Sequence, residues 1–292
     1  MRPPEWTILS ILEWTTGYFR KCHIETPRLD AEILLAHSLG LKRIDLYLRY
    51  DQPLGTDERA AYKRLVQRRA AREPVALIVG QREFWSLDLV VAPHVLTPRP
   101  ETEHVVEAAL AFLQSNAVVP DPLVLDLGTG SGCIAVALAH CFPAARVVAS
   151  DISRPALATA RGNIVRHHLT DRVALVAGSA MDMFASTRSC FDLIVSNPPY
   201  IPSADIATLA PEVRDYEPRG ALDGGVDGLD AYRRIIPAAA TCLRPGGALI
   251  LEIGWDQRQA INLLLEQSGG YRTWACTADY AGHDRVINAV RA

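Results

Sequence analysis

The feature that most constrains this fold is a regular alternation of strand-like and helix-like segments after residue 120. Short apolar runs rich in β-branched residues are separated by longer segments whose apolar residues recur with helical spacing. Such alternation is typical of a mostly parallel sheet with helices on both faces, and ligands of these sheets bind beyond the carboxyl ends of the strands. We expect strands at 123–127, 147–150, 173–176, 193–196, 248–253 and 286–290, and helices at 134–140, 155–166 and 231–242.

The first seventy or so residues have a different pattern, which predicts a helical domain. Thr26 and Pro27 are the expected N-cap and first-turn residues of one helix, and another helix is expected to begin near Thr56. The apolar run 75–79 and the β-type composition of 84–91 then predict a β-hairpin. We therefore expect a helical domain at 1–73, a hairpin linker at 74–95 and an α/β domain at 96–292.

Length and composition place the chain among ordinary globular proteins. It has 292 residues, of which 49% are apolar and 22% charged, which suits about two folded domains and excludes a disordered or collagen-like chain. There are 30 basic and 33 acidic residues, so the formal net charge is −3. This balance disfavours a protein whose main task is to coat nucleic acid, and we expect no stable binding of nucleic acid.

Two features of the sequence bear on cellular location and on cofactors. They are the spacing of its cysteines and histidines and the absence of a long apolar run. No apolar run is long enough to span a membrane, and the N-terminus has no apolar core of a secretory signal. The six cysteines form no Cys-x-x-Cys pair and the eight histidines show no metal-ligand spacing. We therefore expect free thiols, a cytoplasmic protein without membrane contact, and no metal site.

A glycine-rich turn follows the first strand of the alternating region. Gly128, Gly130 and Gly132 let the backbone turn tightly and let a ligand approach the main chain closely. The pattern is Gly-x-Gly-x-Gly and not the dinucleotide fingerprint, because Cys133 stands where the third glycine of that fingerprint would be. Asp151 ends the second strand, where a carboxylate can accept both ribose hydroxyls of an adenosine. The combination resembles the S-adenosylmethionine site of class I methyltransferases.

Further residues near this turn are candidates for the cofactor site. Asp126 is expected either to orient the turn or to approach the methionine end of the ligand. Asp182, Met183 and Phe184 follow the third strand, where methyltransferases contact adenine, and the last two either pack on the ring or belong to the core. The predicted cofactor contacts are Gly128, Thr129, Gly130, Ser131, Gly132, Asp151, Asp182, Met183 and Asn197.

The motif Asn197-Pro-Pro-Tyr200 follows the fourth strand. An amide or aromatic amine nitrogen is a poor nucleophile because its lone pair is delocalised, so the site must align it and accept hydrogen bonds from its N–H groups. Carbonyl oxygens of Asn197 and Pro198 suit that task, Pro199 stiffens the loop, and Tyr200 offers a flat face. Prepositioning is expected to supply most of the rate. The motif resembles that of amino-methyltransferases of amide nitrogen or of adenine, and does not choose between them.

Several longer stretches carry a more specific resemblance. Together they are similar, over the whole chain, to the bacterial peptide-chain-release-factor glutamine N5-methyltransferases, the PrmC/HemK family. The resemblance implies an α/β fold of the class I S-adenosylmethionine-dependent type, with a seven-stranded, mostly parallel Rossmann-like sheet, a small N-terminal helical domain and a β-hairpin linker. The stretches that carry it are 98–103, 194–202, 216–225, 227–234 and 282–286.

The same resemblance implies an activity and residue roles. The family transfers a methyl group from S-adenosylmethionine, leaving S-adenosylhomocysteine, to the glutamine side-chain nitrogen of the Gly-Gly-Gln loop of release factors, which modulates translation termination. By motif, Asn197, Pro198, Pro199 and Tyr200 would hold the glutamine amide and carry the catalysis. Arg99 and Glu101 would flank the pocket, and the N-terminal helices would recognise the release factor.

Two other segments have a functional and a structural interpretation. The glycine-rich segment 223–228 does not follow calcium-loop spacing and does not join a strand to a helix, so we interpret it as a flexible wall of the site. The second is a basic stripe that is either a solvated helix face or a contact for an acidic partner or RNA. Its members are Lys63, Arg64, Arg68, Arg69 and Arg72.

Two alternative functions remain at this point. An adenine N6-methyltransferase acting on DNA or RNA would have to flip its base into the pocket and grip phosphates, which the net charge of −3 disfavours. A non-catalytic docking module of the translation machinery would use the same fold without transferring a methyl group. The substitution Asn197→Ala separates the last possibility from an enzyme, because only an enzyme would lose a measurable rate.

Overall fold

The chain folds into two units with separate hydrophobic cores, as a computed structural model shows for residues 6–115, 120–179 and 189–292. The first unit contains the residues up to Gln81 together with 210–216, and the second contains 82–209 and 217–292. The short segment 210–216 therefore leaves the second unit in sequence, packs within the first, and returns. Within the described residues, no helix is both long and apolar enough to cross a membrane.

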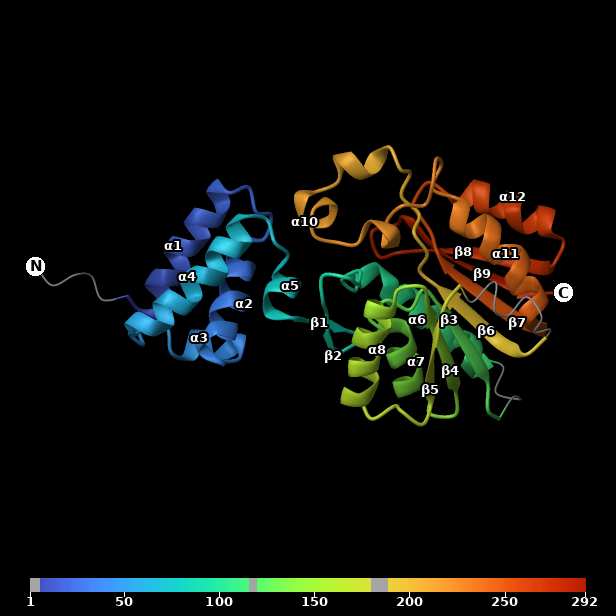
Figure 1. Ribbon diagram of the computed structural model, residues 1–292, viewed down its shortest axis with the longest axis horizontal. Coiled ribbons are helices and arrows are strands. Elements are labelled where there is room, and N and C mark those ends of the chain that lie inside the picture. The colour runs from blue at the N-terminus through green and yellow to red at the C-terminus, as the bar shows by residue number, and fades with distance from the viewer. Residues whose placement is uncertain (1–5, 116–119, 180–188) are drawn as a thin grey trace, which may run out of the picture. The chain divides into compact units, whose positions relative to one another are not determined.

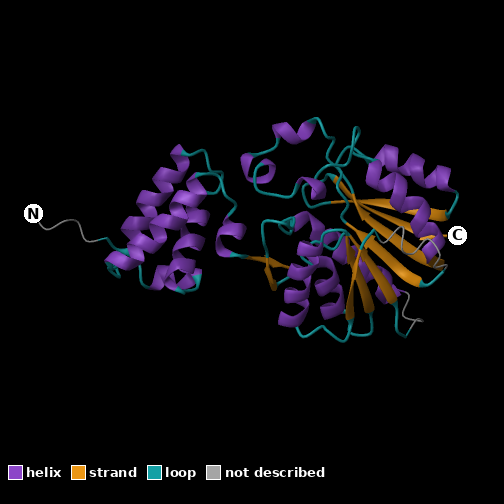
Figure 2. Ribbon diagram, in the orientation of Figure 1, coloured by secondary structure: helices purple, strands orange, loops and turns teal. Residues whose placement is uncertain are grey.

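The first unit is built from helices and loops in its described part (Figure 2). Proline and glycine punctuate it: Pro27 begins one helix, and the left-handed Gly40 ends it. The hydroxyl of Tyr62 donates to the carbonyl of Ala31 (3.1 Å), which ties two of the helices together. The helices are α1 (Ile8–Lys21), α2 (Pro27–Leu39), α3 (Arg43–Leu48), α4 (Thr56–Ala70), α5 (Val75–Val79) and α10 (Pro211–Arg214).

A buried ion-pair network joins α10 to the helices of this unit. Arg69 is 6% exposed; it donates to Asp30 (2.7 Å) and through two nitrogens to Glu212 (3.0 Å each). Arg72 donates to the other oxygen of Glu212 (2.6 Å), and Arg68 pairs with Glu73. Three members of the basic stripe are therefore held in ion pairs of the protein itself. The interpretation as a solvated helix face applies to the exposed Lys63, Arg64 and Arg68, but not to the buried Arg69.

The linker differs in part from the prediction. The run Val75–Val79 is a helical turn and not a strand, so that expectation is wrong. Pro74 caps this turn and the left-handed Gly80 ends it, which are helix-boundary signals that outweigh the β-propensity of five residues. A hairpin is present just afterwards, as the two-stranded sheet of β1 (Gln81–Phe84) and β2 (Leu87–Val90), so its first strand and its turn lie later in the chain than predicted.

The second unit is organised around a seven-stranded sheet with the order β5-β4-β3-β6-β7-β9-β8 (Figure 1). Its first five strands in this order are parallel, and β9 and β8 are antiparallel to their neighbours, which confirms the mostly parallel α/β fold. The strands are β3 (Leu123–Leu127), β4 (Arg146–Asp151), β5 (Val173–Ala177), β6 (Phe191–Ser196), β7 (Leu243–Glu252), β8 (Tyr271–Ala278) and β9 (Asp284–Arg291).

Helices cover both faces of this sheet, as Figure 1 shows. Successive residues of β3 point to opposite faces: Val124 belongs to the core under α6, α7 and α8, and Leu125 to the core under α11 and α12. Strands buried on both faces therefore appear as continuous apolar runs in the sequence. The helices are α6 (Glu103–Ser115), α7 (Cys133–Cys141), α8 (Arg154–Arg166), α11 (Asp230–Cys242) and α12 (Arg258–Ser268), with the short η1 (Pro100–Thr102), η2 (Asp205–Thr208) and η3 (Arg219–Ala221).

Buried polar groups attach the hairpin to the sheet's helices. Asn163 on α8 accepts from the backbone N–H of Val90 (2.7 Å) and donates to that residue's carbonyl (3.0 Å) and to the carbonyl of Ser131 (2.8 Å). Its side chain is fully buried. One asparagine thus fixes β2 and the glycine-rich turn against the same helix, which positions the turn at the sheet's carboxyl edge.

Candidate active site

A cavity of about 340 Å³ lies at the carboxyl edge of the sheet. That volume lies in the range of small-molecule sites. The ends of β3, β4 and β6 all contribute to its lining, so the two predicted motifs meet in one cavity. The predicted residues that line it are Gly128, Gly130, Asp151, Asn197, Pro198 and Pro199.

The glycine-rich turn shapes one end of the cavity with its backbone. Gly128 has a φ of +69°, and a Cβ at this position would meet no atom within 4 Å, so it would enter open space. Gly132 has a φ of +83°, and a Cβ there would lie 3.2 Å from the Cβ of Ala160 on α8. The first glycine therefore leaves room for a ligand, and the other allows close packing of the turn on α8.

Asp151 at the end of β4 faces this turn. Its Oδ2 accepts from the N–H of Gly130 (2.9 Å) and its Oδ1 accepts from the N–H of Ser153 (2.8 Å). Each carboxylate oxygen has a further lone pair, so the side chain can still accept two hydroxyl groups from a ligand. The geometry suits a carboxylate that binds both hydroxyls of a ribose.

Asp126 is buried beneath the turn. Its Oδ2 accepts from the hydroxyl of Thr129 (2.6 Å) and from the N–H of Ala135 (3.2 Å), so it orients the turn. Burial raises the pKa of Asp126 to about 7, against the opposing effect of these two donors. Its Oδ1 is buried and has no hydrogen-bond partner among the described residues. An orphan acceptor next to an open glycine cradle fits a ligand that brings a donor or positive charge.

The other end of the cavity depends on side-chain hydrogen bonds. The amide of Asn197 donates to the hydroxyl of Thr102 (3.0 Å), which donates in turn to Oε2 of Glu252 (2.7 Å). The hydroxyl of Tyr200 lies 3.4 Å from the other oxygen of Glu252. Burial raises the pKa of Glu252 to about 7. Neither Thr102 nor Glu252 was predicted as a site residue. Thr102 belongs to the stretch 98–103 that carries the family resemblance, but nothing in the sequence pairs it with Asn197 or with Glu252.

The loop after β6 is tightly packed against Gln257 and the segment 223–228. Gln257 donates to the backbone carbonyls of Tyr200 (2.9 Å) and Gly228 (3.3 Å), and a Cβ on Gly228 would lie 2.4 Å from that Tyr200 oxygen. The segment 223–228 therefore supports the loop and is not a flexible wall: its residues are not among those that line the cavity. Close approach of two backbones, and not mobility, accounts for its glycines.

Three further predicted residues, Arg99, Glu101 and Ser131, are not among those that line the cavity. Arg99 pairs with the buried Glu217 (2.5 Å), whose carboxyl has its pKa raised by burial, and Glu101 is exposed. Ser131 is buried, and its carbonyl is bound by Asn163. The predicted Asp182 and Met183, with Phe184, lie outside the described residues, although the cavity lining reaches the preceding Gly178 and Ser179.

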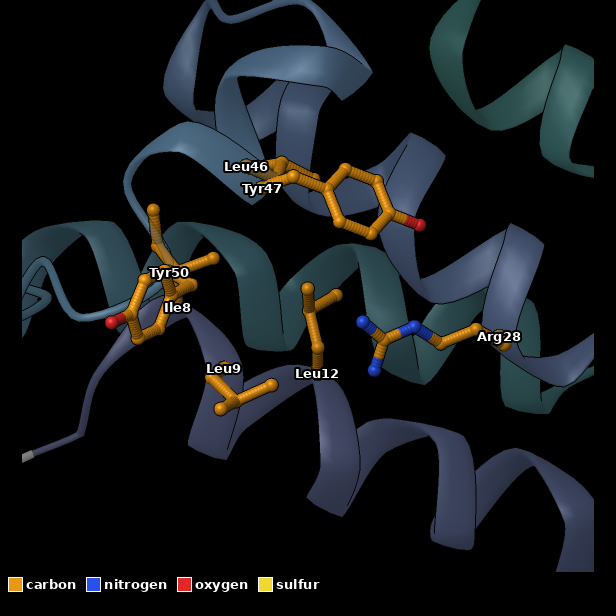
Figure 3. Close-up of a pocket in the computed structure, with 7 residues that line it drawn as sticks. All are labelled: Ile8, Leu9, Leu12, Arg28, Leu46, Tyr47 and Tyr50. Carbon is orange, nitrogen blue, oxygen red and sulfur yellow. The ribbon is translucent and has the colours of Figure 1, made fainter.

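A second cavity, of about 190 Å³, lies within the helical unit (Figure 3). Figure 3 shows mostly apolar side chains around it, with the guanidinium of Arg28 at one end. Nε of Arg28 donates to Glu32 (2.6 Å), and the hydroxyl of Tyr47 donates to the same carboxylate (2.6 Å). These polar groups stabilise the helices, and the cavity holds no pair of groups suited to catalysis. Within the described residues, no cluster of three potential metal ligands is present.

Comparisons with known proteins agree with this geometry. Residues 10–80 match the family model described as PrmC N-terminal domain, and residues 104–211 match that of the methyltransferase small domain. The chain is also similar in structure to the catalytic domain of hMettl16, solved in complex with MAT2A 3'UTR hairpin 6. The TM-score is 0.56 at 17% identity, over 77% of this chain and 81% of that one. At this identity the likeness shows a shared fold only.

Sequence relatives are far more similar. The release factor glutamine methyltransferase of Geobacter sulfurreducens is 48% identical over 98% of this chain and 97% of its own length. Those of Rhodopirellula baltica and Moorella thermoacetica are 44% and 46% identical, over 98% and 92% of this chain and 97% and 93% of their own lengths. Similarity at this level over nearly the full length shows common family membership. The chain belongs to the release factor glutamine methyltransferase family.

Proposed function

We propose that this protein transfers the methyl group of S-adenosylmethionine to the side-chain amide nitrogen of the glutamine in the Gly-Gly-Gln loop of peptide chain release factors. One observation carries the proposal: Asn197, Pro198 and Pro199 line the same cavity as the glycine turn and Asp151. Membership of the release factor glutamine methyltransferase family supports this substrate over adenine and over a docking role without catalysis.

The cofactor would lie at the end of the cavity formed by β3 and β4. S-adenosylmethionine supplies an electrophilic methyl group on a positively charged sulfur. Asp151 would accept the ribose hydroxyls, while Gly128 and Gly130 allow close approach to the backbone. The buried carboxyl of Asp126, with one oxygen unpaired among the described residues, favours a ligand that brings a hydrogen-bond donor or a positive charge, and a nearby cation would in turn favour its ionised form. We retain Asp182 and Met183 as proposed contacts of the adenine.

The glutamine amide would lie at the other end, against Asn197. The side-chain oxygen of Asn197 and the backbone carbonyl of Pro198 would accept the two amide N–H groups and hold the nitrogen in line with the methyl–sulfur bond. As the carbon–nitrogen bond forms, the carbon–sulfur bond breaks and its electron pair remains on sulfur. The nitrogen then loses one proton to solvent, and S-adenosylhomocysteine leaves as the second product.

The helical unit is proposed to recognise the release factor. A single glutamine side chain offers too little contact to select one protein, so a separate binding surface is needed. We propose that the helical domain at 1–73 supplies this surface, with the hairpin region at 74–95 as linker and 96–292 as the catalytic domain. Arg99 and Glu101 are proposed to border the entrance to the catalytic cavity.

Mass spectrometry tests the proposal directly. The protein is incubated with S-adenosylmethionine and an intact release factor, and in parallel with adenine-containing duplex DNA. We expect one added methyl group on the Gly-Gly-Gln peptide and none on the DNA. Replacing that glutamine with asparagine in the release factor is the matched control, and should abolish the modification. Methyl transfer to DNA alone would overturn the proposal in favour of adenine methylation.

A further inference from the structure

The hydrogen-bond chain from Asn197 to Glu252 joins three segments that are remote in sequence. Asn197 follows β6, Thr102 ends η1, and Glu252 ends β7. Thr102 is 2% and Glu252 1% exposed, so water does not compete for these bonds. The distances are 3.0 Å from Asn197 Nδ2 to Thr102 Oγ1 and 2.7 Å from Thr102 Oγ1 to Glu252 Oε2.

The chemistry of these groups gives the chain a direction. An ionised carboxylate only accepts hydrogen bonds, so the single hydroxyl proton of Thr102 points to Glu252. The hydroxyl oxygen of Thr102 can then only accept, and the amide of Asn197 must present its NH₂ group to it. The side-chain oxygen of Asn197 is consequently at the end of the amide that does not bind Thr102, and Asn197 lines the cavity.

We propose that Thr102 and Glu252 are positioning residues that set which end of the Asn197 amide faces the substrate. The inference rests on the proposed function, in which that oxygen accepts an N–H of the glutamine amide. A reversed amide would present N–H groups to the N–H groups of the substrate, which repels the ground state and removes the acceptor needed in the transition state. The two positioning residues act through Asn197 and do not themselves touch the substrate.

The direction depends on the charge of Glu252. A protonated carboxyl can donate to Thr102, whose own proton is then free to point at Asn197 and stabilise the reversed amide. The charged and titratable groups that face Glu252 are Arg285 on β9, Glu101 on η1, Cys133 on α7, Tyr200 after β6 and Tyr232 on α11. Burial dominates this environment and raises the pKa of Glu252 to about 7, with Arg285 opposing the shift. The hydrogen bonds that fix the orientation of the Asn197 amide are therefore expected to weaken as pH falls below about 7.

Steady-state kinetics with an intact release factor test the role of Thr102. Thr102→Val keeps the shape and removes the hydroxyl, and we expect kcat to fall about thirtyfold, less than the fall of about a hundredfold or more for loss of a preorganised polar group itself, because Asn197 remains. The KM for release factor and the affinity for S-adenosylmethionine should change less than about threefold. Thr102→Ser restores the hydroxyl and should recover at least half of kcat. Thr241→Val, which removes a hydroxyl bonded to the carbonyl of Ala238 within α11 and outside the cavity lining, is the matched control and should keep full activity.

The pH profile of kcat tests the role of Glu252. Asp126, at the cofactor end, titrates in the same pH range. The cofactor is kept at a saturating concentration, so that a change in cofactor affinity caused by Asp126 does not alter the measured rate. In Glu252→Gln the side chain can accept from Thr102 but can also donate to it, as the protonated carboxyl can, so we expect a kcat that is below the wild-type value at pH 8, close to the wild-type value below about pH 6, and without the wild-type decline near pH 7. We expect the decline at low pH in kcat, because the orientation of the Asn197 amide matters in the complex with bound substrate.

The outcomes separate the inference from the proposed function. A wild-type protein that does not methylate the release factor would overturn the proposed function. An active wild type with Thr102→Val equally active, or with the same decline near pH 7 in Glu252→Gln, would overturn only the positioning role. Should Thr102→Val not fold, as judged by circular dichroism, the pH profile of the isosteric Glu252→Gln decides alone.

Discussion

The two ends of the catalytic cavity are built in different ways. At the cofactor end, the backbone of one contiguous turn does most of the work, with Asp151 bound to two backbone N–H groups. At the transfer end, the site is held by hydrogen bonds between side chains from three segments that are distant in sequence. The cofactor end therefore depends on glycines, which have no side chain. The transfer end depends on the hydrogen-bonding atoms of particular side chains.

This difference predicts how each end fails. A backbone-built site should tolerate changes in its side chains but not the addition of a Cβ at a critical glycine. A side-chain network should fail when one atom changes, because Thr102 and Glu252 are buried and each bond fixes the next. The predictions below test this contrast, beginning with the largest expected effect.

The strongest test at the transfer end is Asn197→Ala. Loss of the acceptor for the substrate amide is expected to lower kcat by about two orders of magnitude, the scale found for removal of one preorganised polar group. The affinity for S-adenosylmethionine, measured by calorimetry, should change little, because the ribose and the glycine turn are untouched. A variant with a near-normal rate would show that the transfer end does not depend on this side chain.

At the cofactor end, Asp151→Ala should have the opposite kinetic signature. A hydrogen bond to a charged group contributes about 1.5–3 kcal/mol, so loss of the carboxylate is expected to weaken cofactor binding by about tenfold to a hundredfold. With saturating cofactor, kcat should stay within about threefold of wild type. Calorimetry checks the affinity, and unchanged binding would contradict a role for Asp151 at the ribose.

The contrast between the ends also decides what sequence alone could predict. The glycine-rich turn is contiguous in sequence, so the spacing of its glycines and of Asp151 at the end of the next strand predicted the cofactor end. The Asn197 motif was equally visible. Its support from Thr102 and Glu252 was not, because a contact across 150 residues leaves no local pattern. The family resemblance carried the choice of glutamine over adenine, which the motif itself left open.

The fold shows the same limit. Strand β3 (Leu123–Leu127), which is buried on both faces, was predicted with the observed bounds because its apolar run is nearly continuous, whereas the other predicted strands are one to four residues longer in the structure. Strand β8 (Tyr271–Ala278) was not found from residue pattern, since it is an edge strand and only Tyr271 among its residues is buried. Val75–Val79 was misassigned because a five-residue apolar run suits a strand as well as a helical turn.

A matched pair of glycine substitutions tests the backbone-built end. Gly132→Ala forces a residue with a Cβ into a φ of +83° and against Ala160 at 3.2 Å, and should cost about 1–3 kcal/mol of folding stability. Gly162→Ala, in α8 and with nothing within 4 Å of the new Cβ, should instead stabilise the protein by about 0.5–1 kcal/mol. Thermal unfolding measures both. Equal shifts of the same sign would contradict the packing role of Gly132.

The smallest effect concerns the pH dependence of stability. In the folded protein the pKa of Glu252 is about 7, above its ordinary value of 4.5, so the folded state binds more protons than the unfolded state between these values. Stability should therefore be lost as pH rises from about 4.5 to about 7. Glu252→Gln removes this titration, so its melting temperature relative to wild type should rise by a few degrees between pH 5.5 and pH 8.

A surface control separates this effect from a general change in charge. Glu266→Gln alters an exposed carboxylate on α12, and its melting temperature should follow that of wild type across the same pH range. Parallel curves for wild type and Glu252→Gln would mean that the buried carboxyl does not resist ionisation. The transfer end would then keep its charge at every pH tested, and its dependence on single side-chain atoms would rest on geometry alone.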